Sequence, residues 1–148
     1  MTPRRRARMA ALEALFEMDF HEREEDALME ERLRATRLSA ENRAFAQRLV
    51  HGVRDHRGAI DGCIGEAAPQ WPVDQLAHVD KNVLRLAIYE LMFDNSAPAK
   101  VAITEAIELA RLFGGGSSPK FVNGVLGAVM AQLERSSNAA ELAAGEVN

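Results

Sequence analysis

The arginines near the start of the chain are the first candidates for chemistry. Arg4, Arg5, Arg6 and Arg8 supply four positive charges within the first eight residues, and no acidic residue lies among them. An arginine side chain presents a planar fork of N–H donors that grips a phosphate in two places and stacks on bases. The cluster therefore predicts an anion-binding surface.

The place of these arginines in a predicted helix supports the same interpretation. Thr2 is a suitable N-cap and Pro3 suits a first helical turn, so the helix should begin ahead of the arginines. A helix N-terminus already carries about half a positive charge, and stability alone would favour acidic residues there. A solvated, frayed terminus is the alternative that the sequence leaves open.

A second candidate site lies at the predicted start of the last helix. Ser117 or Ser118, followed by Pro119, opens this helix, and its free backbone N–H groups would point toward an anion beside Lys120. Phe121 lies off the apolar stripe of the helix, where its ring could stack on a base of single-stranded RNA. The alternative is that Phe121 closes the end of the bundle as a core-edge residue.

The sequence offers no arrangement typical of catalysis or of metal binding. The stretch GGGSSPK lacks the second glycine and the Ser/Thr of a phosphate loop. His51 and His56 are five residues apart, a spacing that does not aim both at one metal. Glu105 and Glu108 are expected on a solvated face, and Cys63 has no neighbouring cation to activate its thiol. We therefore expect a protein that is not an enzyme, with no cofactor and no metal.

The charge of the chain is unevenly distributed. The 148 residues carry a formal charge of −4, from 18 basic and 22 acidic residues. Without the four N-terminal arginines, 14 basic residues face 22 acidic ones, a charge of −8. Such an acidic body would repel nucleic acid everywhere except at its basic tip, and it could face a basic protein partner.

Composition also bounds the class of protein. A single cysteine excludes an internal disulfide and fits a reducing cytoplasm. No apolar run approaches the roughly 18 residues of a membrane span. We expect one cytoplasmic domain with no membrane partner.

The spacing of apolar residues predicts an all-α fold of about seven helices. The predicted helical segments are residues 2–20, a short surface helix within 21–38, one bent helix or two over 40–66, then 79–93, 101–113 and a last helix from 117 or 118. Residues 79–93 are apolar around most of the helix, which places them in the middle of a bundle. The glycines at 114–116 are expected to end a helix in the left-handed conformation.

Four stretches resemble the NusB family of bacterial transcription antitermination factors: RRRARMAALEALF, VDKNVLRLAIYEL, KVAITEAIELARLFG and SPKFVNGVLG. The resemblance implies one helical RNA-binding domain over residues 1–134, in two subdomains joined near 67–73, and leaves 135–148 as a flexible tail. It also implies binding to the box A element of ribosomal RNA leaders together with the tenth small-subunit ribosomal protein. In that complex the family helps RNA polymerase read through terminators.

The resemblance also assigns residues. It implies RNA contacts for Arg4, Arg5, Arg6 and Arg8 and for a second patch of Ser117, Lys120 and Phe121, and it ties Asp80 to the ribosomal protein. The chain departs from the family pattern at Thr104, at the GGGS loop and at Gly127.

Two other functions stay open at the level of sequence. A NusB-like helical module also heads a family of ribosomal RNA cytosine methyltransferases, which would make the chain part of an enzyme. A structural bundle that associates with itself is the second alternative, and a homodimer is compatible with every reading.

Overall fold

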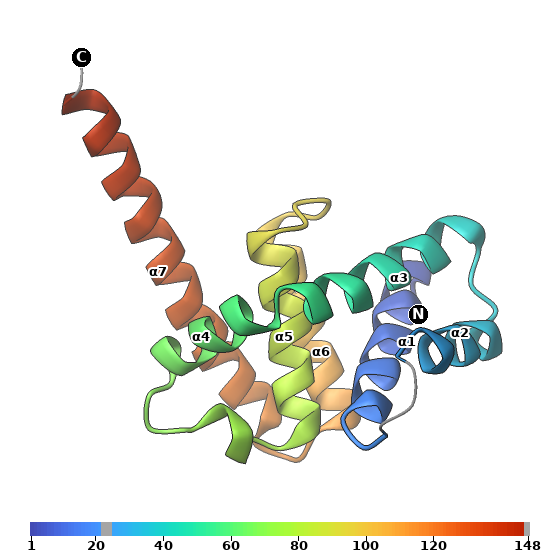
Figure 1. Cartoon of the computed structure of the whole chain (residues 1–148). Coiled ribbons are helices and arrows are strands. Elements are labelled where there is room, and N and C mark those ends of the chain that lie inside the picture. Colours follow the sequence, from blue (N-terminus) through green and yellow to red (C-terminus); the bar gives the residue numbers. More distant parts are fainter. Residues whose placement is uncertain (22–24, 147–148) are drawn as a thin grey trace.

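Helices account for all the regular structure in the computed structural model, which describes residues 1–21 and 25–146 (Figure 1). In chain order they are α1 (Pro3–Met18), α2 (Glu25–Thr36), α3 (Ala40–Asp55), α4 (Arg57–Ala67), the short 3₁₀ helix η1 (Val73–Gln75), α5 (His78–Met92), α6 (Ala99–Phe113) and α7 (Ser118–Glu146). The described residues contain no strand, so the predicted all-α fold of about seven helices is confirmed.

Two of the helices begin at capping side chains: Thr2, as the sequence predicts, and Ser39. The Thr2 hydroxyl accepts a hydrogen bond from the backbone N–H of Arg5 at 3.2 Å. The Ser39 hydroxyl accepts one from the backbone N–H of Asn42, also at 3.2 Å. Each bond satisfies a backbone donor that has no partner inside its helix, and so fixes where α1 and α3 begin.

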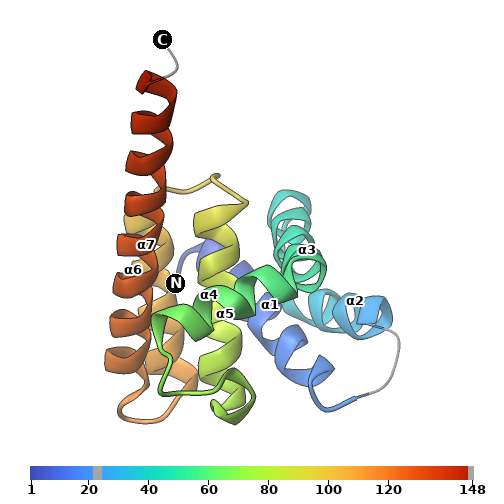
Figure 2. The same ribbon diagram turned by 60° about the vertical axis from the view of Figure 1, so that its left-hand side comes forward.

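Helix α5 is the centre of the molecule. It contacts α1, α3, α4, α6 and α7, and every residue from Lys81 to Glu90 is buried. Figures 1 and 2 show the other helices arranged around it. The central position predicted for residues 79–93 is confirmed, because a helix that is apolar around most of its circumference must be covered on most sides.

The helices around α5 form two groups. Helices α1, α2 and α3 contact one another, whereas α4 and α6 both contact α7. Residues 40–66 form two helices that break at His56, so the alternative of one bent helix is excluded. Helix α3 packs on α1 and α2, whereas α4 packs on α7, so the change of packing partners falls at His56. The joint implied by the resemblance lies later, near residues 67–73. The division into subdomains stays a prediction.

The end of α6 corrects one expectation. The helix ends at Phe113, just before the three glycines, but no described glycine has a positive φ, and Gly114 is extended with φ −94° and ψ −177°. A Cβ on Gly114 would lie 2.5 Å from the Ser118 hydroxyl oxygen. Glycine is needed here because α7 begins against the backbone of the turn, and left-handed geometry plays no part.

Helix α7 is longer than the sequence predicts. It continues to Glu146 and extends beyond the rest of the molecule (Figures 1 and 2). The structure therefore differs from a frayed end, although the side chains of residues 134–145 are all exposed. The flexibility of the segment from residue 135 stays a prediction. Neither α7 nor any other described helix is long and apolar enough to cross a bilayer.

Candidate nucleic-acid interface

The last of the N-terminal arginines lies inside the protein. The Arg8 side chain is 5% exposed, and its guanidinium donates hydrogen bonds to the two carboxylate oxygens of Glu90 at 2.8 and 3.1 Å. Glu90 belongs to α5 and is 3% exposed, so the ion pair is closed to solvent. The RNA contact of Arg8 stays a prediction, and in the structure its guanidinium neutralises a buried carboxylate and joins α1 to α5.

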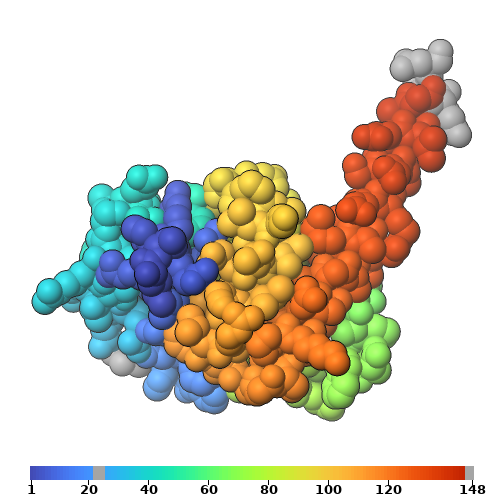
Figure 3. Space-filling model, turned by 180° about the vertical axis from the view of Figure 1, so that it is seen from behind, coloured from blue at the N-terminus to red at the C-terminus, as the bar shows by residue number. Residues whose placement is uncertain are grey.

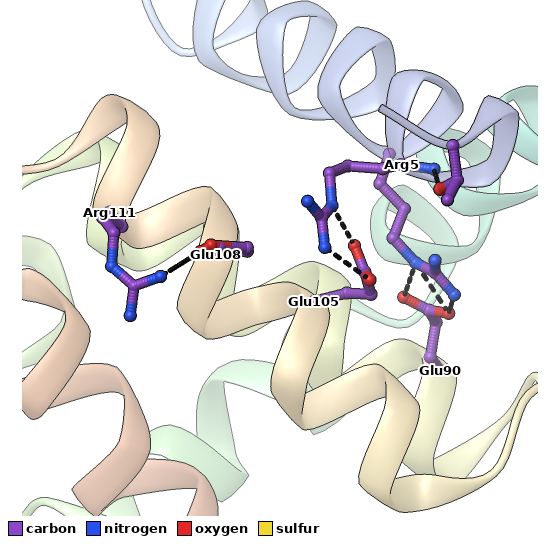
Figure 4. A network of polar contacts seen from close by, with 7 residues as sticks. Arg5, Glu90, Glu105, Glu108 and Arg111 are labelled. Carbon is purple, nitrogen blue, oxygen red and sulfur yellow. Dashed lines mark hydrogen bonds and ion pairs between the residues drawn. The ribbon is translucent and has the colours of Figure 1, made fainter.

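Arg5 is also paired within the protein. Its Nε and Nη2 donate to the two oxygens of Glu105 on α6 at 2.8 and 3.1 Å (Figure 4). The hydrogen bond and the charge of Arg5 hold the pKa of the Glu105 carboxyl below its ordinary value, and Glu105 raises the pKa of Arg5. A phosphate that binds Arg5 must therefore compete with this carboxylate.

The same pair corrects the expected solvated face on α6. Glu105 is only 14% exposed and is held by Arg5. Glu108 is 21% exposed and pairs with Arg111 on its own helix, which Figure 4 shows one turn farther along. The acids at these two positions bind arginines. The spacing along α6 contains the pair of Glu108 and Arg111, three residues apart, but not the pairing of Glu105 with Arg5 on α1.

Arg4 and Arg6 are better placed to meet a ligand. Arg4 is 41% exposed; its Nη2 lies 3.7 Å from a Glu41 oxygen and its guanidinium carbon 4.1 Å from the centre of the Phe45 ring. Arg6 is half-buried and donates from Nη2 to the carbonyl of Thr36 at 2.7 Å. The N-terminal residues lie beside α6 on the face shown in Figure 3. Among the described residues, neither of these two arginines forms a close ion pair with a buried carboxylate.

A second surface gathers the remaining predicted residues. A hollow of about 430 Å³ lies between the start of α5 and the start of α7. It is lined by Trp71, Gln75, Leu76, Ala77, Asp80, Ser117, Lys120 and Phe121. The resemblance assigns three of these residues to RNA and Asp80 to a protein partner, and the structure brings all four to one site.

Two aromatic side chains form a wall of this hollow. Phe121 is half-buried and packs against the core, and its ring meets that of Trp71 edge to face, with centroids 6.2 Å apart and planes at 81°. Trp71 is 54% exposed. Trp71 lies within the predicted joint near residues 67–73, and the sequence analysis assigns it no role in binding.

Asp80 lies close to the start of α5 but does not cap the helix. The N-cap of α5 is Ala77, and Asp80 lies in the first turn, where a carboxylate complements the helix dipole. Its Oδ1 atom is buried and has no hydrogen-bond partner among the described residues. A buried carboxylate oxygen without a partner is costly, so this atom is suited to receive a donor from a ligand.

A separate groove of about 430 Å³ runs along α1. It is lined by Leu12, Glu13, Phe16, Glu17, Arg32, Val79 and Phe113. Phe16 is 37% exposed and Phe20 is 55% exposed. The centroids of their rings are 5.0 Å apart. Neighbouring exposed aromatic rings are typical of a protein-docking surface.

The described residues hold no group of three or more His, Cys, Asp and Glu side chains able to bind a metal. Burial and the charge of Glu66 raise the pKa of the Cys63 thiol, which keeps it in the unreactive protonated form.

Known proteins similar to this chain share both its sequence and its fold. The profile described as NusB family matches residues 5–131. The transcription antitermination protein NusB of Chloroflexus aggregans is 48% identical over 139 residues, 91% of this chain and 93% of that protein. The corresponding protein of Dehalococcoides mccartyi strain 195 is 44% identical over 128 residues, 86% of this chain and 90% of its own.

Two solved structures are similar to the whole helical body. NusB of T. maritima has 39% identity and a TM-score of 0.81, and the match covers 87% of this chain and 91% of that one. A structure of antitermination factors NusB and NusE in complex with double-stranded RNA has 28% identity and a TM-score of 0.79, over 87% of this chain and 96% of that one.

Proposed function

This chain belongs to the NusB family, and we propose that it binds the box A element of ribosomal RNA leaders together with the tenth small-subunit ribosomal protein. Its relatives are transcription antitermination proteins, and we place this chain in the same process, in the cytoplasm and without catalytic activity. In that role it would help RNA polymerase read through terminators.

One observation carries the RNA-binding proposal. Ser117, Lys120 and Phe121 line the same hollow as the exposed Trp71, so a cation and two aromatic rings meet at one surface. That combination suits single-stranded RNA, whose phosphates seek positive charge and whose unpaired bases stack on rings. A related structure of NusB and NusE in complex with double-stranded RNA supports RNA as the class of ligand.

The N-terminal arginines would supply a second set of contacts. We assign phosphate binding to Arg4 and Arg6, because the Arg4 side chain is 41% exposed and Arg6 donates to the backbone carbonyl of Thr36 rather than to a carboxylate. Arg5 would join them only when its pair with Glu105 opens. Arg8 is left out because it is buried against Glu90.

We assign the protein partner to the groove on α1. Phe16 and Val79 supply apolar surface there. Glu13 and Glu17 share Arg32 as their ion-pair partner, which leaves a net negative charge that suits a basic ribosomal protein. Asp80 follows Val79 directly in the chain, so a partner contact of Asp80 would fall at the border between this groove and the aromatic hollow.

A titration tests the proposal. Labelled box A RNA is titrated with the protein, with and without the ribosomal protein, over a range of salt concentrations. We expect binding that weakens with salt and tightens when the ribosomal protein is present. Salt-independent binding, or no effect of the ribosomal protein, would contradict the proposal.

The Phe121→Ala variant sharpens this test. Loss of a stacked base should weaken RNA binding by about 1–3 kcal/mol while leaving association with the ribosomal protein intact. Phe93→Ala is the control, because Phe93 is a partly exposed ring outside the hollow. If Phe121→Ala instead loses about 3–5 kcal/mol of folding stability and its folded fraction binds RNA normally, Phe121 is a core residue.

A further inference from the structure

We propose that the hollow between α5 and α7 holds one unpaired RNA base that carries an exocyclic amino group, stacked by Trp71 and read by Asp80. The inference rests on the proposed function, since the base belongs to the bound RNA. It assigns a role to Trp71 and gives the site a base preference.

The size and walls of the hollow suit a base. Its volume of about 430 Å³ lies within the range of small-ligand sites, roughly 300–1,000 Å³. Trp71 and Phe121 meet edge to face, so they offer two ring faces at a steep angle to each other. Since more than half of the Trp71 side chain is exposed, a flat ligand can cover it.

The aromatic pair also separates this hollow from a second one. A smaller hollow of about 220 Å³ shares Trp71, Lys120 and Phe121 with the first, and its other wall includes Gly124 and Val125 on α7. Lys120 therefore lines both hollows. A single strand that crosses the rings can place a base in one hollow and keep its phosphate near Lys120.

Asp80 determines which base the hollow prefers. Its buried Oδ1 atom has no hydrogen-bond partner in the part of the chain that the structure describes, and Asp80 lines the first hollow. A carboxylate oxygen accepts hydrogen bonds and cannot donate them. Cytosine presents an amino group at its 4-position, whereas uracil presents a carbonyl oxygen at the same place. Asp80 therefore favours cytosine over uracil.

Two homopolymers test the preference. Fluorescein-labelled oligo(C) and oligo(U) of about twelve nucleotides have equal length and charge, so the phosphate contribution to binding is the same for both. We expect the unmodified protein to bind oligo(C) about tenfold more tightly than oligo(U). Asp80→Asn should bring the two affinities within about twofold, because an amide can offer either a donor or an acceptor.

Matched variants separate the roles of the residues. Asp74→Asn is the control for Asp80→Asn, since Asp74 is an exposed acid on η1 that does not line the hollow. Trp71→Ala should weaken both homopolymers and reduce their ratio, and Trp71→Phe should restore part of each. Lys120→Ala should weaken both equally and keep the ratio. Thermal unfolding of each variant identifies any that fail to fold.

The outcomes distinguish this inference from the function on which it rests. Equal binding of oligo(C) and oligo(U) by the unmodified protein would overturn the base slot and leave RNA binding in place. Binding of neither would overturn both. If Asp80→Asn keeps the ratio but loses the ribosomal protein, Asp80 belongs to the partner interface and the inference is wrong.

Discussion

At the scale of single residues, the N-terminal arginines divide into two kinds. Arg8 and Arg5 form close ion pairs with carboxylates on α5 and α6. Arg4 lies 3.7 Å from the exposed Glu41, and Arg6 donates to the Thr36 carbonyl. Arginines that tie helices together and arginines that meet a ligand thus share one short segment. Replacing the whole cluster at once would mix a loss of stability with a loss of RNA binding, so the residues must be changed separately.

Arg8→Ala should destabilise the protein by about 3–5 kcal/mol, because it leaves the Glu90 carboxylate buried without its partner. Urea unfolding measures this loss. Arg34→Ala, on the exposed side of α2, should change stability by less than about 0.5 kcal/mol. The double variant Arg8→Met, Glu90→Leu should recover most of the loss. An unchanged unfolding midpoint for Arg8→Ala would contradict the buried pair.

Glu105→Gln should lower stability near neutral pH but not in acid. Arg5 lowers the pKa of Glu105 in the folded state, so the ion pair stabilises the protein above the ordinary glutamate pKa of about 4.3, and this contribution is lost as pH falls through the lowered value. The melting temperatures of Glu105→Gln and of the unmodified protein, measured from about pH 7 to about pH 3, should converge as the pH falls. Glu134→Gln, at an exposed position on α7, should show no such pH dependence.

At the scale of helices, close approach decides where glycine is required. A Cβ on Gly52 of α3 would lie 2.1 Å from the ring of Tyr89 on α5, whereas Gly62 on α4 has no atom within 4 Å of its Cβ position. Both glycines are inside helices, and only one lies at a helix crossing. The crossing of α3 and α5 therefore depends on the absence of a side chain at Gly52.

The two glycines give a matched pair of substitutions. Gly52→Ala should cost about 1–3 kcal/mol, since the buried Tyr89 ring must move. Gly62→Ala should stabilise the protein by up to about 1 kcal/mol, because alanine reduces the freedom of the unfolded chain. Unfolding free energies measured in urea check both signs. A destabilising Gly62→Ala would contradict the open space on α4.

How much the sequence predicts depends on the range of the interaction. Nearby residues predict the helix start at Thr2 and the central place of residues 79–93, and the structure bears out both. The pairing of Arg8 with Glu90 joins residues 82 positions apart, and no local pattern contains it. Likewise Trp71 and Asp80 share one hollow with Phe121 only because the loop before η1 and the starts of α5 and α7 meet there.

At the scale of the whole molecule, the two candidate RNA surfaces are separated. Figure 3 shows α6 lying between the N-terminal residues and α7. An RNA that used both surfaces would have to pass over α6, on a chain whose net charge is −4. Binding should therefore depend strongly on a few cations, and each should contribute separately to its salt dependence.

The double variant Arg4→Ala, Arg6→Ala should weaken RNA binding and flatten its dependence on salt, by about one unit of slope for each lost phosphate contact. Affinity measured at several salt concentrations gives the slope. Arg135→Ala, at an exposed position on α7, should leave it unchanged. If the double variant keeps the original slope, the RNA docks elsewhere.

The burial of α5 on all sides determines how the protein exchanges its amide hydrogens. Amides between Lys81 and Glu90 are covered by helices of both packing groups, so they can reach deuterium only when the whole structure opens. Their protection factors should therefore agree with one another and give the global free energy of unfolding. The exposed turns of α7 beyond Glu134 have no such cover and should exchange first.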